Sequence, residues 1–205
     1  MPQELTVVGV VVLTAFVFVL MTSFTRISII LTFLRQALST TVPSSQIIIG
    51  LSLILTGYIM HPVLSQIYEE ALVPYLESEE KQTKTFLERA WPPLSAFMLQ
   101  NTREKDLQLF LDMGQSTEEP ADLSEIAWFY VVPAFVISEL RTAFMLGFLL
   151  FLPFLVIDMV VTSLLMSMGM VLLPPVMISF PFKILLFVVV DGWQLIVQQV
   201  ISGYQ

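Results

Sequence analysis

Two long stretches without a charged residue occupy the first third of the chain. Leu5–Thr25 is a run of 21 residues and Gln36–Tyr68 is a run of 33. Each exceeds the ~20 residues that a helix needs to cross a bilayer, so both are predicted to be membrane helices. Pro43 followed by Ser44 and Ser45 predicts a turn and a helix start near the beginning of the second stretch.

The stretch Ile126–Met170 is again strongly apolar, but prolines and charges interrupt the pattern. It contains Pro133 and Pro153 together with Glu139 and Arg141. Proline removes a helix hydrogen bond, so this stretch is expected to form a bent helix or a hairpin rather than one straight span.

The chain ends in one more apolar stretch after a double proline. Pro174–Pro175 predicts a turn, and Val176–Ile201 predicts the last apolar helix, interrupted by Lys183 and Asp191.

A polar segment separates the apolar parts of the chain. Gln66–Ile126 is predicted to form amphipathic helices and loops, with breaks at Trp91–Pro93 and Thr117–Pro120. The predicted fold is therefore all-α: a polytopic membrane protein of long, bent helical hairpins. A small polar helical domain is inserted between the second and third apolar segments, which gives domains at 1–65, 66–126 and 127–205.

Composition supports a membrane protein and locates its excess charge. The chain is 56% hydrophobic and 13% charged, against ~25% charged residues in soluble domains. Gln66–Ile126 has five basic and thirteen acidic side chains, so this segment alone contributes the net charge of −8. An acidic segment repels nucleic-acid phosphates, so no nucleic-acid partner is expected.

The distribution of arginines predicts the orientation of the chain. Arg26 and Arg35 lie between the first two apolar stretches without an acidic residue, which favours a cytoplasmic connection. The N-terminus and the acidic segment are then expected on the outer side of the inner membrane. Because no basic residue precedes Leu5, the first helix is expected to be retained rather than removed as a signal peptide.

The sequence offers little material for catalysis or metal binding. It has no cysteine and one histidine, His61, and it contains no nucleophile elbow, phosphate loop or zinc motif. Asp158 and Asp191 are the nominal pair for an intramembrane protease, but Lys183 competes for either carboxylate. No catalytic, cofactor or metal site is predicted, and the protein is not expected to be an enzyme.

Six ionisable residues in apolar surroundings are predicted to form a buried charge network. Each costs ~2.5 to 3.5 kcal/mol on insertion into a membrane and so requires a partner or water. Their charges sum to zero, which suits pairing within or between subunits. For Arg26 and Arg35 the alternative is that the side chain extends to the membrane surface. The network comprises Arg26, Glu139, Arg141, Asp158, Lys183 and Asp191.

The position of the turn decides which charges in the last hairpin meet. If the turn centres on Met170 and Val171, Asp158 and Lys183 each lie about twelve residues, or ~18 Å, from it and come level. If it centres on Pro174–Pro175, Asp158 meets Asp191, which is repulsive. The first register is favoured because it forms a salt bridge.

Met166, Met168 and Met170 surround a glycine directly before the double proline. Methionine is flexible and apolar, so such side chains from several subunits could close a pore and yield to a passing polypeptide. Ordinary core packing is the alternative that the spacing leaves open.

Seven motifs, in order along nearly the whole chain, resemble the FliP family of flagellar export-apparatus proteins. The virulence-system SctR branch of that family shares the later motifs, whereas the first and third look flagellar. The motifs are Met21–Ile27, Leu34–Leu38, Asn101–Leu107, Ser138–Phe144, Phe151–Asp158, Pro174–Lys183 and Asp191–Trp193.

The resemblance implies a subunit of the flagellar type III export gate, in the bacterial inner membrane and the flagellar basal body, with the polar domain in the periplasm. It implies a pentamer that joins FliQ and FliR in a channel for unfolded flagellar polypeptides. It also implies that the apolar helices of the assembled complex form a cone held largely above the membrane plane.

The family's channel gasket has consecutive methionines after the glycine, where this chain has Met170, Val171 and Leu172. The expected gasket therefore mixes methionine with aliphatic side chains, and with the two preceding methionines it comprises Met166, Met168, Met170, Val171 and Leu172. The alternative function is a polytopic membrane transporter or channel in which the buried ionisable residues form the solute path.

Overall fold

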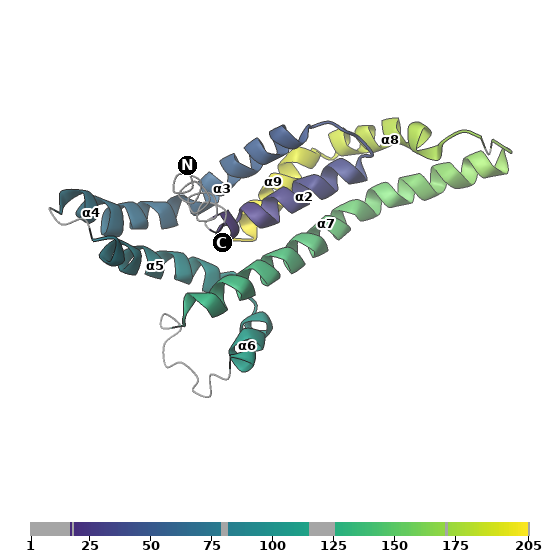
Figure 1. Cartoon of the computed structure of the whole chain (residues 1–205). Coiled ribbons are helices and arrows are strands. Elements are labelled where there is room, and N and C mark those ends of the chain that lie inside the picture. Colours follow the sequence, from purple (N-terminus) through teal and green to yellow (C-terminus); the bar gives the residue numbers. More distant parts are fainter. Residues whose placement is uncertain (1–16, 18, 79–81, 115–125, 171, 205) are drawn as a thin grey trace, which may run out of the picture. The chain divides into compact units, whose positions relative to one another are not determined.

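The computed structural model describes residues 17, 19–78, 82–114, 126–170 and 172–204, and these residues form helices and connections without a strand. This confirms the all-α prediction. In chain order the elements are α2 (Phe24–Ala37), α3 (Ser45–Ile67), the π-helical turn η1 (Tyr68–Leu72), α4 (Val73–Glu77), α5 (Thr83–Gln100), α6 (Glu104–Met113), α7 (Trp128–Ser167), α8 (Pro175–Val189) and α9 (Gly192–Ser202) (Figure 1).

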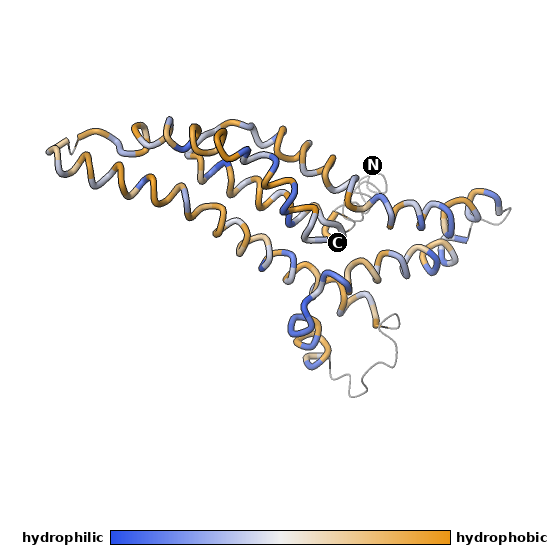
Figure 2. The backbone as a smooth tube through the Cα atoms, turned by 180° about the vertical axis from the view of Figure 1, so that it is seen from behind, coloured by the Kyte–Doolittle hydropathy of each residue, from blue (hydrophilic) through white to orange (hydrophobic). Residues whose placement is uncertain are grey.

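Two helical stretches of the described chain are long and apolar enough to cross a membrane. They are Ser45–Glu77, with 33 residues, and Trp128–Ser167, with 40. The bent pair of α8 and α9 makes a third if it is counted as one span. Apolar residues dominate α7 and α8, whereas polar residues are frequent around α6 (Figure 2). Most of the predicted first helix, Leu5–Thr25, lies outside the described residues.

Prolines interrupt the helices less than the sequence predicts. The break expected at Trp91–Pro93 is wrong, because α5 continues through Pro92 and Pro93. The two carbonyls that lose their donors belong to Glu88 and Arg89, which are exposed, so water can satisfy them. The break predicted at Thr117–Pro120 lies outside the described residues.

Pro133 and Pro153 are likewise accommodated within the single helix α7. The hairpin expected as one alternative for Ile126–Met170 does not form within this stretch, because Trp128–Ser167 is one continuous helix. The hairpin forms beyond its end, where Gly169 adopts a φ of 72° and Pro174 precedes the first residue of α8.

The last apolar helix is two helices rather than one. Lys183 lies inside α8 without interrupting it, and the chain bends by 62° between α8 and α9. Asp191 takes a left-handed φ of 50° at this bend. A side chain at Gly192 would collide with the ring of Phe187, which itself packs edge-to-face against Trp193 at 5.5 Å. This packing requires glycine after the bend.

The connection expected around Arg26 and Arg35 is also wrong, because both arginines lie within α2. Every third or fourth residue of α2 is apolar and buried, from Ile27 to Leu34, which is the pattern of a helix packed along one face. The buried apolar face therefore makes this segment a helix, although it contains two arginines.

The described chain divides into two compact units. Unit 1 is Thr56–Arg141 with the described part of Met1–Thr25, and its core contains the edge-to-face pair of Phe97 and Phe135. Unit 2 is Arg26–Leu55 with Thr142–Gln205. In unit 2, α8 runs back along the second half of α7 (Figure 1).

Candidate functional site

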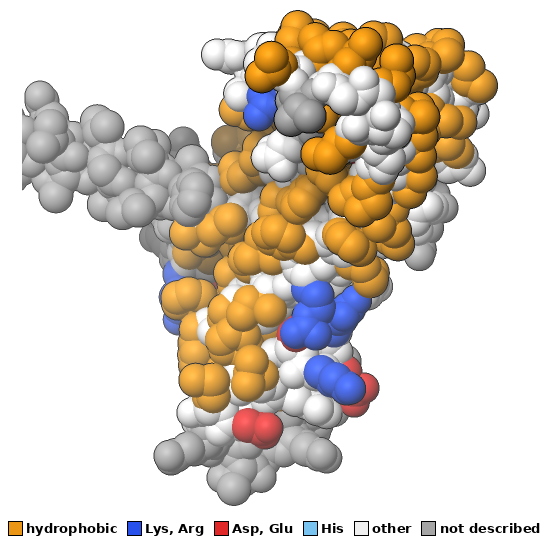
Figure 3. Space-filling model, turned by 90° about the vertical axis from the view of Figure 1, so that its right-hand side faces the viewer, with side chains coloured by type: hydrophobic (Ala, Val, Ile, Leu, Met, Phe, Trp, Pro, Cys, Tyr) orange, Lys and Arg blue, Asp and Glu red, His pale blue; other side chains and the backbone are white. Residues whose placement is uncertain are grey.

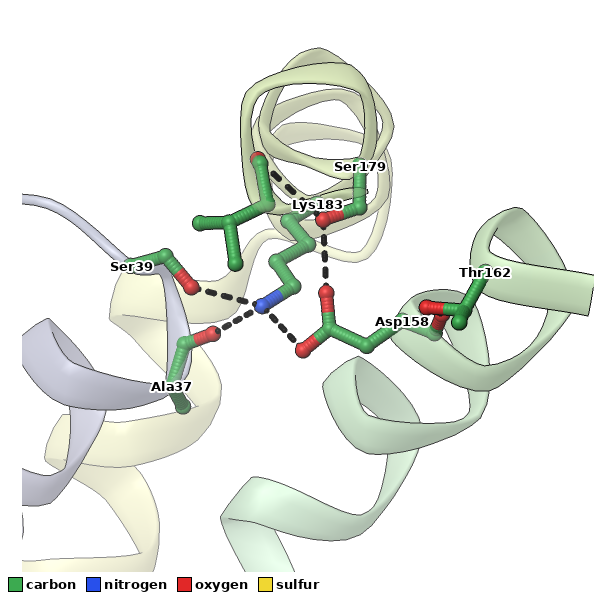
Figure 4. A network of polar contacts seen from close by, with 7 residues as sticks. Ala37, Ser39, Asp158, Thr162, Ser179 and Lys183 are labelled. Carbon is green, nitrogen blue, oxygen red and sulfur yellow. Dashed lines mark hydrogen bonds and ion pairs between the residues drawn. The ribbon is translucent and has the colours of Figure 1, made fainter. Parts of the chain in front are cut away.

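Unit 2 contains a buried ion pair between the two arms of the α7–α8 hairpin. The Nζ atom of Lys183 on α8 lies 2.6 Å from Oδ2 of Asp158 on α7 (Figure 4). The side chain of Lys183 is 1% exposed and that of Asp158 is 33% exposed. This is the register favoured by the sequence, so the predicted pairing of Asp158 with Lys183 is confirmed.

The ammonium group of Lys183 has two further acceptors, both from the end of α2. It donates to the carbonyl of Ala37 at 3.0 Å and to Oγ of Ser39 at 2.8 Å. An ammonium has three donors, so all of its hydrogen bonds are satisfied within one chain. The last carbonyls of a helix have no donor within that helix and lie at the negative end of its dipole, so a cation is favoured here.

Asp158 is held by α8 through a second contact. The hydroxyl of Ser179 donates to Oδ1 of Asp158 at 2.6 Å, while Oδ2 accepts from Lys183. Ser179 lies one helical turn before Lys183, so both side chains project from the same face of α8. The site therefore joins three helices of unit 2 through charge-assisted hydrogen bonds, which are stronger than neutral ones.

The turn of the hairpin contains the methionines that the sequence singles out. Met166, Met168 and Met170 are exposed, and Leu172 is 99% exposed. Val171 lies outside the described residues. The described part of this cluster is therefore on the surface of the chain and not in its core.

Arg26 lies in a separate contact of unit 2. Its guanidinium donates to the carbonyl of Gly203 at 3.0 Å and stacks on the ring of Tyr204, with 3.9 Å from Cζ to the ring centroid. Arg26 is buried and lies at the C-terminal end of α9, where a cation is favoured. Its side chain therefore does not extend to the surface, the alternative that the sequence left open.

The remaining members of the predicted network do not join Lys183. Glu139 is fully buried in unit 1, whereas Asp191 is exposed at the bend between α8 and α9. The side chain of Arg141 is 54% exposed, and its Nη2 atom lies 3.4 Å from Oδ1 of Asp106. The six residues therefore do not form one network: Asp158 pairs with Lys183, whereas Arg26 and Arg141 make other contacts.

Sequence reasoning missed a second polar cluster, which connects α6 to α7 within unit 1. Asp106 is buried, and its Oδ2 accepts a hydrogen bond of 2.8 Å from the hydroxyl of Ser138. The same hydroxyl accepts from the backbone N–H of Arg103 at 3.0 Å. Asp106 lies in the first turn of α6, where a carboxylate is favoured.

The signal for these missed residues was present in the motifs. Asp106 and Ser138 each belong to one of the seven segments that resemble the family, and Ser179 belongs to another. Ser39 had no such signal. Among the described residues no group of His, Cys, Asp and Glu is arranged to hold a metal ion.

Comparison with known proteins gives one consistent match. The model of the FliP family matches residues 7–200. "Flagellar biosynthetic protein FliP" of Bacillus subtilis (strain 168) is 50% identical over 189 residues, which are 92% of this chain and 85% of that protein. The protein of the same name from Pectobacterium carotovorum subsp. carotovorum is 46% identical over 186 residues, 90% of this chain and 71% of that protein. The one from Aquifex aeolicus (strain VF5) is 45% identical over 194 residues, 92% and 80% of the two chains.

Proposed function

Since this chain belongs to the FliP family, we propose that it is a subunit of the flagellar type III export gate. It forms the channel with copies of itself and with FliQ and FliR, and unfolded flagellar polypeptides pass through. Membership of the family makes the chain a membrane-associated component of the flagellar export apparatus. The channel, its partners and its orientation go beyond family membership and are what we propose.

One observation supports assembly above the others: the α7–α8 hairpin presents an apolar surface that remains exposed among the described residues. Val156, Val160 and Leu164 are exposed along α7, with spacings of four residues that place them on one face. Leu185 and Val188 are exposed on α8. Apolar side chains dominate the upper part of the face in Figure 3.

A groove on this hairpin supports the same conclusion. It has a volume of 480 Å³ and lies between α7 and α8, lined only by apolar side chains, among them Val161, Leu165 and Phe182. Apolar surface of this extent favours burial against other subunits or lipid. Assembly with further copies and with FliQ and FliR buries it against protein.

The methionine turn is proposed as the gasket of the closed channel. Met166, Met168, Met170 and Leu172 are exposed at the end of the hairpin, and Val171 is included by its place in the sequence. Flexible methionine side chains from several subunits can pack against one another and then separate. The role is one of closure, without catalysis or a cofactor.

The acidic segment 66–126 is proposed as the periplasmic part, between the apolar segments 1–65 and 127–205. This side of the inner membrane is the one that the resemblance to the FliP family implies for the polar segment. The complex then lies in the flagellar basal body at the inner membrane.

Alanine replacement of Met166, Met168 and Met170 together tests the gasket. The variant is expected to assemble with FliQ and FliR, measured by copurification, and to raise ion leakage through the complex, measured in cells that express all three proteins. Met113→Ala, an exposed methionine of α6, is the matched control and is expected to leave leakage unchanged. Unchanged leakage in a fully assembled triple variant contradicts the gasket and favours simple packing.

A further inference from the structure

Two helices of unit 2 end in the same backbone closure but use different residues. At the end of α7, Gly169 has a φ of 72°. Its N–H donates to the carbonyl of Met166 at 3.1 Å, and the N–H of Met170 donates to the carbonyl of Leu165 at 2.9 Å. This is the Schellman closure, in which one residue must adopt a positive φ, usually glycine because it has no Cβ.

At the end of α2 the same position is occupied by serine. Ser39 has a φ of 54°. Its N–H donates to the backbone carbonyl of Gln36 at 2.9 Å, and the N–H of Thr40 donates to the backbone carbonyl of Arg35 at 3.3 Å. A residue with a Cβ adopts this conformation at a cost. Glycine would adopt this backbone conformation without that cost, so the presence of serine indicates a second role for its hydroxyl.

The contacts of Lys183 identify that role. Oγ of Ser39 accepts from Nζ of Lys183 at 2.8 Å, beside the bond of 3.0 Å to the carbonyl of Ala37. The end of α2 thus supplies two of the three acceptors of a cation that is 1% exposed, and Asp158 supplies the third (Figure 4). Residue 39 is exposed, so without Ser39 Oγ this donor of the ammonium exchanges a fixed acceptor for mobile water, and Lys183 is held less firmly.

We propose that Ser39 is a positioning residue of the α7–α8 hairpin. Its hydroxyl holds the ammonium of Lys183 against the end of α2, and this fixes α8 directly and α7 through Asp158. The part that concerns the gate rests on the proposed function, whereas the placement of Lys183 rests on the contacts alone.

Two substitutions separate the hydroxyl from the backbone. Ser39→Gly removes the hydroxyl and relieves the left-handed backbone, whereas Ser39→Ala removes the hydroxyl and keeps the Cβ. Thr40→Ala changes the next residue of the same turn and serves as the matched control. None of the three removes a charge, so each full-length chain can be purified in detergent and compared with the parent chain.

Acetylation by acetic anhydride, followed by mass spectrometry, measures how well Lys183 is held. The rate at Lys183 is divided by that at Lys84, whose side chain is 89% exposed. The ratio is expected to rise about tenfold in both Ser39→Gly and Ser39→Ala, the order of a lost hydrogen bond to a charged group. Thr40→Ala is expected to match the parent chain.

One result overturns the positioning role. If Lys183 stays as protected in Ser39→Gly as in the parent chain, the hydroxyl does not hold it, whatever the rate in Ser39→Ala.

Ion leakage through the assembled complex then tests the connection to the gate. Ser39→Gly is expected to raise leakage and reduce motility. If Lys183 reacts faster in this variant but leakage is unchanged, the placement of Lys183 does not affect the gate. Failure of the proposed function is distinguishable, because in that case the methionine variants do not leak either, although the reactivity of Lys183 still depends on Ser39.

Discussion

Lys183 and Asp158 form an ion pair of 2.6 Å across the α7–α8 hairpin, and the two partners differ in burial. The ammonium is enclosed and has two neutral acceptors from α2 besides the carboxylate. The carboxylate is partly exposed and also accepts from Ser179. Removing Lys183 and removing Asp158 are therefore expected to have different consequences.

Alanine substitutions of the pair are expected to be unequal. Asp158→Ala leaves a buried ammonium without a counter-ion, a loss of ~3 to 5 kcal/mol for a fully buried pair. Lys183→Ala leaves a carboxylate that water can reach, so its loss is smaller. The double alanine variant is expected to recover part of the larger loss. Assembly yield and motility measure all three, and double-variant losses equal to the sum of the single losses indicate that the residues are not coupled.

Exchanging the two charges is expected to fail, which distinguishes this site from a simple pair. Aspartate at position 183 faces the carbonyl of Ala37 and the negative end of α2, and it has no donor for them. The combination of Asp158→Lys with Lys183→Asp should therefore assemble less well than the double alanine variant. Equal or better assembly of the exchanged chain argues that α2 has no part in the site.

Gly169→Ala is expected to destabilise the hairpin turn by about 1 kcal/mol, since Gly169 has a φ of 72° that a residue with a Cβ adopts at a cost. The matched change is Gly50→Ala within α3, where a Cβ meets no atom within 4 Å. That change should instead stabilise the helix by ~0.5 to 1 kcal/mol. Thermal unfolding in detergent measures both, and a shift of the same sign in both variants contradicts the role of the turn.

Ser138→Ala is expected to loosen the attachment of α6 to α7. It removes the donor to Oδ2 of Asp106 and the acceptor of the Arg103 N–H, which costs ~1 to 3 kcal/mol for a buried group. Hydrogen exchange at the amides of α6 should accelerate while that of α8 stays unchanged. Ser202→Ala, an exposed serine, is the control, and slow exchange of α6 in Ser138→Ala counts against this attachment.

Local patterns allowed much of the fold to be predicted. Runs of apolar residues predicted the two longest helical stretches, and the double proline predicted the turn before α8. The pairing of Asp158 with Lys183 followed from counting residues to a turn at Met170 and Val171, because helical rise fixes which residues come level. Prolines were less reliable, because the cost of a missing hydrogen bond depends on whether the freed carbonyl reaches water or another donor.

The sequence by itself determined the family and the helical class, since these depend on motifs and on apolar runs. It favoured one of two registers of the last hairpin, because distances along a helix fix which charges come level. Only the tertiary structure decided what else Lys183 binds, because Ala37 and Ser39 are 146 and 144 residues away along the chain. The same holds for Asp106 and Ser138, 32 residues apart. Such contacts depend on how helices pack, and a helical period fixes only which face a residue occupies, not which side chain or carbonyl meets it.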